Sequence, residues 1–141
     1  MTRTFRRFVS ACACAAFLFG TLILMGCGSS STAPITSTQV VLLDTSVTLL
    51  AGVTCNTGNM AVDFTGTAGK TVTISATGAA TLTPQFTLYA PDFATQLAGA
   101  TSSSAGSASL TFTLTQTGVH HVSLCDTKGV AGTLRVTVTQ Q

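Results

Sequence analysis

The chain has 141 residues, of which 45% are hydrophobic and only 7% are charged. That length allows one domain rather than two, and so few cations exclude a nucleic-acid-binding surface, which needs many phosphate contacts. Serine and threonine fill more than a quarter of the positions. Abundant Thr and Val with little Glu or Lys favour β-strands over helices, and the hydrophobic content is opposite to that of disordered chains.

The N-terminus has the pattern of a secretory signal peptide. Arg3, Arg6 and Arg7 precede an apolar run over 8–25, and the small residue Gly26 follows it. This order of features defines a signal peptide, so we predict a helical signal segment over 1–26. The run is about 18 residues long, near the minimum for a membrane span, so an uncleaved transmembrane helix is the alternative. Both interpretations place the remainder of the chain outside the cytoplasm.

The end of this leader, Leu24-Met25-Gly26-Cys27, resembles the lipobox of bacterial lipoproteins. The resemblance implies that Cys27 becomes the first mature residue and carries a diacylglycerol thioether and an N-acyl chain such as palmitate. Each buried methylene contributes about 0.8 kcal/mol, so two or three chains make a lasting membrane anchor. Gly28, rather than Asp, follows the cysteine, which implies the outer membrane if the cell is Gram-negative.

Cysteine usage agrees with export. After removal of residues 1–26 and lipidation of Cys27, two cysteines remain, Cys55 and Cys125. An even remainder in an exported chain favours a disulfide, and the alternative is two free thiols. The mature part keeps three cations against four aspartates, so its net charge is about −1.

Residues 27–38 are rich in Ser and Thr without periodicity, which predicts a flexible tether. Over 39–141, apolar and polar residues alternate in seven short runs separated by Gly, Asn, Pro and Asp. Period two gives each strand one buried and one wet face. Seven or eight such strands predict an all-β domain, an antiparallel β-sandwich of jelly-roll type. The buried phase contains Val47, Leu49, Val62, Phe64, Val72, Ile74, Ala76, Phe86, Leu88, Leu110, Phe112, Leu114, His120, Val122, Leu124, Leu134, Val136 and Val138.

Four segments, 68–74, 86–92, 118–122 and 132–136, resemble the bacterial pre-peptidase C-terminal domain. That family carries in this order a Gly-x-x-Val turn and strand, a Leu-Tyr-x-Pro-Asp strand end and a late Gly-x-Tyr strand. The resemblance covers about residues 44–139 and implies a jelly-roll-like, non-catalytic sandwich that often serves as an accessory or substrate-contacting module. His120 stands where the family usually has Tyr.

His120 and His121, with Cys125 and Asp126 nearby, raise the question of a metal site. Neighbours on a strand point to opposite faces, and zinc needs three or four converging ligands. We therefore predict His120 in the core and His121 exposed. A calcium site at Asp92 or Asp126 lacks the usual ligand spacing, so we predict no metal and no cofactor.

The sequence matches known nucleotide-binding and catalytic motifs only in part. Gly69-Lys70-Thr71 resembles the end of a phosphate-binding loop, but Phe64 occupies the position of its first glycine and strand alternation follows. A hairpin turn is the simpler interpretation. Ser102-Ser103-Ser104 lies in a small-residue loop without a nucleophile elbow, and Asp126 with His121 is the one local acid–base pair. We predict no catalytic residue and no enzyme.

These observations predict a lipid-anchored, exported, non-catalytic β-sandwich that acts as an interaction or accessory module at the cell envelope. The alternative is a carbohydrate- or peptide-binding accessory domain. The expected partners are the membrane, through the N-terminal lipid, and a protein or glycan that the sequence does not identify. A concave sheet face bearing Tyr89 or His121 favours ligand binding, whereas a flat Thr-rich face favours a structural role.

Overall fold

The computed structural model describes residues 38–102 and 104–141. The predicted signal segment, Cys27 and all but the last residue of the tether lie outside the described residues. Eight strands follow one another along the chain. They are β1 (Val40–Leu49), β2 (Met60–Gly66), β3 (Thr71–Thr77), β4 (Pro84–Tyr89), β5 (Gln96–Thr101), β6 (Ser107–Thr113), β7 (Gly118–Asp126) and β8 (Gly132–Gln140).

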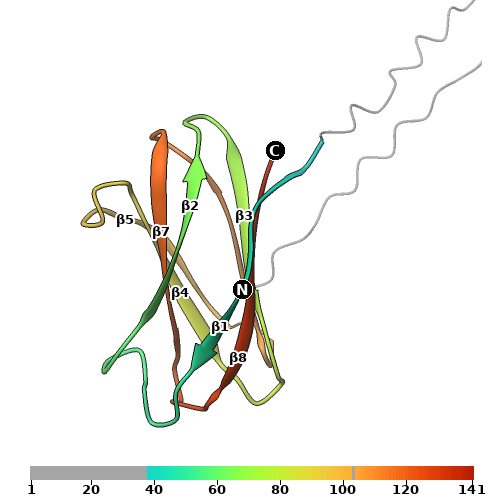
Figure 1. Ribbon diagram of the computed structural model, residues 1–141, viewed down its shortest axis with the longest axis vertical. Coiled ribbons are helices and arrows are strands. Elements are labelled where there is room, and N and C mark those ends of the chain that lie inside the picture. The colour runs from blue at the N-terminus through green and yellow to red at the C-terminus, as the bar shows by residue number, and fades with distance from the viewer. Residues whose placement is uncertain (1–37, 103) are drawn as a thin grey trace, which may run out of the picture. The chain divides into compact units, whose positions relative to one another are not determined.

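The strands form two four-stranded antiparallel sheets, with the orders β1-β8-β3-β6 and β2-β7-β4-β5. Figure 1 shows β2, β7, β4 and β5 on one side and β1, β8 and β3 on the other. Consecutive strands mostly alternate between the sheets, which is the arrangement of a jelly roll. The predicted antiparallel jelly-roll sandwich is confirmed. No helix in the described part of the chain is long and apolar enough to cross a membrane.

The core lies between the sheets and follows the predicted alternation. On β3, the side chains of Val72 and Ile74 are fully buried, whereas Thr73 between them faces outward. Because successive side chains point to opposite faces, each strand supplies every second residue to the core. The same phase buries Phe86, Leu88, Val122, Leu124, Leu134, Val136 and Val138.

Two features differ from the sequence-based expectation. Strand β5 is not among the alternating runs of the sequence, because it consists largely of small residues. One of them, Gly99, lies close to β4, since a Cβ at this position would be 3.2 Å from the carbonyl oxygen of Phe86. The prediction of a hairpin at Gly69-Lys70-Thr71 is wrong, because β2 and β3 belong to different sheets. The turn instead carries the chain across the sandwich, with Gly69 at φ 79°, and strand β3, not a helix, begins at Thr71.

The two ends of the sandwich differ in what they carry. Val40 pairs with Gln140, so β1 begins and β8 ends at one end, whereas Leu49 pairs with Gly132 at the other. Figure 1 shows the first described residues and the C-terminus near each other, and the β1–β2 and β7–β8 connections at the opposite end. Three of the connections at that opposite end, residues 50–59, 78–83 and 127–131, are called the distal loops below; the β5–β6 connection also lies at this end.

Candidate functional site

A buried carboxylate organises the distal loops. Asp126, the last residue of β7, is fully buried and accepts hydrogen bonds from the backbone N–H groups of Thr83 (2.5 Å), Lys128 (2.9 Å) and Val130 (3.0 Å). The Thr83 hydroxyl donates a fourth, at 3.2 Å. One side chain thus fixes the β3–β4 loop against the β7–β8 loop.

The hydrogen bonds also decide the charge of Asp126. Burial raises the pKa of a carboxyl group, but the hydrogen bonds from Val130, Thr83 and Lys128 together outweigh burial and lower the pKa of Asp126 below its ordinary value. The group is therefore ionised at neutral pH, and hydrogen-bond donors from two loops stabilise its charge.

A disulfide fixes the third distal loop. Cys55 in the β1–β2 loop bonds to Cys125 on β7, the pair that the sequence predicts. Beside it, the backbone N–H of Gly52 donates to the carbonyl of Gly129 at 2.9 Å, and Thr54 forms a bridge with Asp126. Binding loops are effective when a rigid scaffold holds them in place, and these contacts supply that rigidity.

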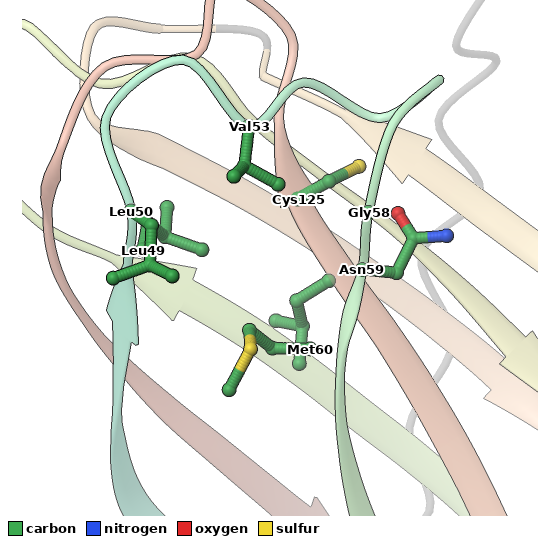
Figure 2. Close-up of a pocket in the computed structure, with 8 residues that line it drawn as sticks. Leu49, Leu50, Val53, Gly58, Asn59, Met60 and Cys125 are labelled. Atoms are coloured by element: carbon green, nitrogen blue, oxygen red, sulfur yellow. The ribbon is translucent and has the colours of Figure 1, made fainter.

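An apolar hollow opens between these fixed elements. Its volume is about 190 Å³. Figure 2 shows Leu49 and Leu50 on one side of it, Val53 and Cys125 next to each other above it, and Met60 below. Leu50 is 62% exposed and Met60 is 44% exposed, so the rim presents apolar surface to solvent. A cavity of roughly 150 Å³ holds one benzene-sized group, and the hollow therefore suits a single apolar side chain.

A wider polar hollow lies on the same end of the sandwich. Its volume is about 470 Å³, and Thr81, Thr83, Thr127 and Lys128 are among its lining residues. The Thr127 hydroxyl donates to the Thr83 hydroxyl at 2.8 Å. Hydroxyl groups and one ammonium group thus lie at the same end of the sandwich as the apolar hollow, which shares no lining residue with the polar one.

The two histidines lie on opposite faces of β7, as predicted. His120 is fully buried and stacks on Phe64, with ring centroids 5.5 Å apart. Its Nδ1 lies 3.1 Å from the Gly118 carbonyl oxygen, while its Nε2 is buried and has no hydrogen-bond partner among the residues that the structure describes. His120 is therefore a core residue.

The prediction that His121 is exposed is wrong, because its side chain is only 18% exposed. Its Nδ1 lies 2.7 Å from Oδ1 of Asp63 on β2, and the ring of Phe93 covers it edge-on at a centroid distance of 4.4 Å. Tyr89 faces the same side of the sheet, as the cross-strand partner of His121.

The structure separates the residues that suggested chemistry. Asp126 pairs with Pro84 and His121 with Tyr89, so about five residues of extended strand, roughly 17 Å, lie between the acid and the imidazole. The Ser102 hydroxyl donates to the Ser104 carbonyl. Among the described residues, no group of three or more His, Cys, Asp or Glu side chains lies close enough to hold a metal ion.

The outer face of the other sheet is rich in hydroxyl groups that pair with one another. Across β3 and β6, Oγ1 of Thr71 lies 3.1 Å from that of Thr113, and Oγ1 of Thr73 lies 3.2 Å from that of Thr111. Cross-strand pairs of this kind stabilise a sheet. A Thr-rich face favours a structural role for this sheet.

Sequence reasoning missed the residues around the hollow and the role of Phe93. One signal for the hollow was present: Leu50 follows Leu49 directly and breaks the alternation just before Gly52. An apolar residue out of phase at a strand end lies outside the core face. The contacts of Val53 and Met60 depend on the disulfide and on long-range packing, which no local pattern carries.

No protein-family model matches the chain, and no curated protein matches it in sequence. Several solved structures are similar, among them the following two. The pre-peptidase C-terminal domain of a collagenase from Bacillus anthracis is 13% identical, with a TM-score of 0.56 over 70% of this chain and 89% of that one. PliG from Aeromonas hydrophila, a periplasmic inhibitor of g-type lysozyme, is 16% identical, with a TM-score of 0.50 over 73% of this chain and 86% of that one. At these identities the likeness shows the fold alone, and it supports the predicted resemblance to a pre-peptidase C-terminal sandwich at that level.

Proposed function

We propose that this protein is an exported, lipid-anchored, non-catalytic binding module of the cell envelope. The observation that carries the proposal is the apolar hollow, which the Cys55–Cys125 disulfide and Asp126 fix at the distal loops. A structural disulfide is typical of proteins outside the cytoplasm. Two of the similar folds are a pre-peptidase C-terminal domain of a collagenase and a periplasmic lysozyme inhibitor, which supports an accessory role.

The position of the hollow suits an anchored protein. The described chain starts at the end of the sandwich opposite the distal loops. A lipid on Cys27, joined through a tether, leaves the distal loops free to meet a partner away from the membrane. If the tether that the sequence predicts over 27–38 behaves as a flexible coil, its expected span is roughly 18 Å, enough to lift the domain clear of lipid headgroups.

The ligand that fits the hollow is an apolar side chain of a protein partner. Small-molecule sites usually measure about 300–1,000 Å³, and the hollow is smaller. Leu50 and Met60 at its rim supply the exposed apolar area that protein interfaces bury at their centre. The module therefore binds through one inserted residue with surrounding loop contacts.

In-cell photo-crosslinking tests this proposal. A benzophenone amino acid at position 50 is compared with one at position 111, an exposed site on the Thr-rich face. We expect position 50 to capture a defined protein that position 111 does not. A benzophenone amino acid at position 60 should capture the same protein, and adding Leu50→Asp to that variant should abolish the capture. Capture of the same proteins from both positions, or capture that survives Leu50→Asp, would overturn the proposal.

A second candidate function is glycan binding, and the polar hollow favours it. Sugar hydroxyls form hydrogen bonds with side chains such as those of Thr81, Thr83 and Lys128. Sedimentation with purified cell-wall polysaccharide tests this candidate. Loss of co-sedimentation in Lys128→Ala together with Thr81→Val, but not in Leu50→Asp, supports glycan binding at the polar hollow.

A further inference from the structure

A second surface lies on the outer face of the sheet β2-β7-β4-β5, away from the distal loops. Asp63, His121 and Tyr89 are aligned as cross-strand partners on β2, β7 and β4. Because all three project from the same face, their side chains form one row. The Nδ1–Oδ1 contact of 2.7 Å between His121 and Asp63 fixes the middle of the row.

Phe93 extends this row from the β4–β5 turn. Its ring packs edge-on against His121 at 4.4 Å and lies 5.8 Å from the ring of Tyr89. The side chain nevertheless remains 56% exposed. A large aromatic side chain in contact with two other rings, yet more than half open to solvent, presents apolar aromatic surface to a partner.

The turn holds Phe93 in this position. Its φ is 57°, a left-handed conformation that bulky residues rarely adopt. The Asp92 carboxylate accepts hydrogen bonds from the N–H groups of Ala94 (2.9 Å) and Thr95 (2.8 Å) and from the Thr95 hydroxyl (2.6 Å). The Phe93 N–H donates to the Ala90 carbonyl at 2.9 Å. The aromatic ring is therefore pre-positioned.

The charge beside Phe93 is negative. The chain has four acidic residues; Asp44 forms an ion pair with Arg135 at 2.7 Å, and Asp126 is buried among loop N–H groups. The other two are Asp92, next to Phe93 in the chain, and Asp63, beside His121. Hydrogen bonds from Thr95 and Ala94 lower the pKa of Asp92 to about 2, so it is ionised at neutral pH. In the described part of the chain, neither carboxylate has a Lys or Arg partner.

We propose that this aromatic–acidic patch (Asp63, Tyr89, Asp92, Phe93 and His121) binds an exposed Arg or Lys side chain of a basic partner segment. The negative face of an aromatic ring attracts a cation within about 6 Å, and a neighbouring carboxylate accepts its N–H groups. Charge complementarity thus selects a cationic residue over a neutral or acidic one. The patch is separate from the apolar hollow, so this proposal does not depend on the function proposed above.

Fluorescence anisotropy with defined peptides tests the proposal on the full chain, purified in a mild detergent. The probe is a labelled peptide of alternating Arg and Ser, and its matched control replaces each Arg with neutral citrulline. We expect the Arg peptide to bind at least tenfold more tightly than the citrulline peptide, with weakening as salt rises. Equal binding of the two peptides overturns the proposal.

Variants of the patch separate recognition from folding. Phe93→Asn removes the ring but suits the left-handed backbone, and Asp63→Asn removes one charge at constant shape; each should weaken binding at least fivefold. Phe93→Trp should retain binding, because Trp is the strongest π partner for cations. Asp44→Asn, on the other sheet, is the control and should leave binding unchanged. Unaltered affinity in Phe93→Asn, or Phe93-dependent binding of a neutral glycan in place of the Arg peptide, contradicts the assignment.

Discussion

Val72 on β3 and Phe112 on β6 lie directly opposite each other, yet only Val72 is fully buried. Both face the core, but β6 is an edge strand and β3 has neighbours on both sides. An edge position can leave a side chain partly open even when its phase is correct, although Phe64 on β2 and Ala108 on β6 are buried. Val62 and Leu110, also on edge strands, are likewise only partly buried.

This difference sets an order of stability losses. Ile74→Ala should destabilise the domain by about 2–5 kcal/mol, because it empties a fully buried site. Phe112→Ala should cost less than the roughly 3–5 kcal/mol typical of a buried Phe, and Thr73→Ala should stay within about 1 kcal/mol. Urea unfolding of the three variants measures the order. Equal losses for Ile74→Ala and Thr73→Ala would mean that the strand register is wrong.

Alternation predicts the strands whose two faces meet different environments. It places Ile74, Leu88 and Val136 in the core because each is flanked by polar residues that face outward. The pattern fails at β5, where Ala98, Gly99 and Ala100 are too small to show a period. Their strand exists because β4 offers them a paired edge, which is a property of the assembled sheet.

The candidate sites were harder to predict for the same reason. The contact of His121 with Asp63 joins residues 58 positions apart, and only the register of β2 against β7 brings them together. Asp126 gains its role from loop N–H groups, which a sequence does not place. The disulfide was predictable because elimination of the other cysteines left only Cys55 and Cys125.

Processing at Cys27 is a direct prediction of the lipoprotein interpretation. Membrane-extracted protein should lack residues 1–26 and carry acyl chains on Cys27, because the leader ends in Gly26-Cys27. Intact-mass spectrometry measures both changes. Cys27→Ala should accumulate the unprocessed precursor, whereas Cys12→Ala, within the leader, should not. A main species that still contains Met1 would contradict the lipid anchor.

The Cys55–Cys125 disulfide should make a large contribution to stability. It closes a loop with a sequence separation of 70 residues, which in the chain-entropy model restricts the unfolded chain by roughly 4 kcal/mol. The double variant Cys55→Ser with Cys125→Ser should therefore unfold at much lower urea concentration. Alkylation without reductant, followed by intact-mass measurement, provides the check on the oxidised protein: two modified thiols would show that the bond does not form.

Asp126 should make the stability of the domain depend on acidic pH. The pKa of this carboxyl is lower in the folded protein than the ordinary value of about 3.9. A lowered folded pKa contributes stability that is complete above the unfolded pKa and is lost as the pH falls through the folded pKa. The parent protein should therefore lose stability below about pH 4.

Asp126→Asn tests the origin of that loss. At pH 7 the variant should be less stable by about 2–3 kcal/mol. A neutral amide replaces a charged acceptor, and the NH2 group of the Asn side chain, itself a donor, faces the N–H donors of the loops. Its stability should then change less than that of the parent between pH 5 and roughly pH 2. Asp44→Asn, which removes an exposed ion pair with Arg135, should change stability little and keep most of the acid-dependent loss. Urea unfolding at each pH measures all three proteins. An acid-dependent loss of the same size in Asp126→Asn as in the parent would show that this carboxylate does not hold the distal loops through its charge.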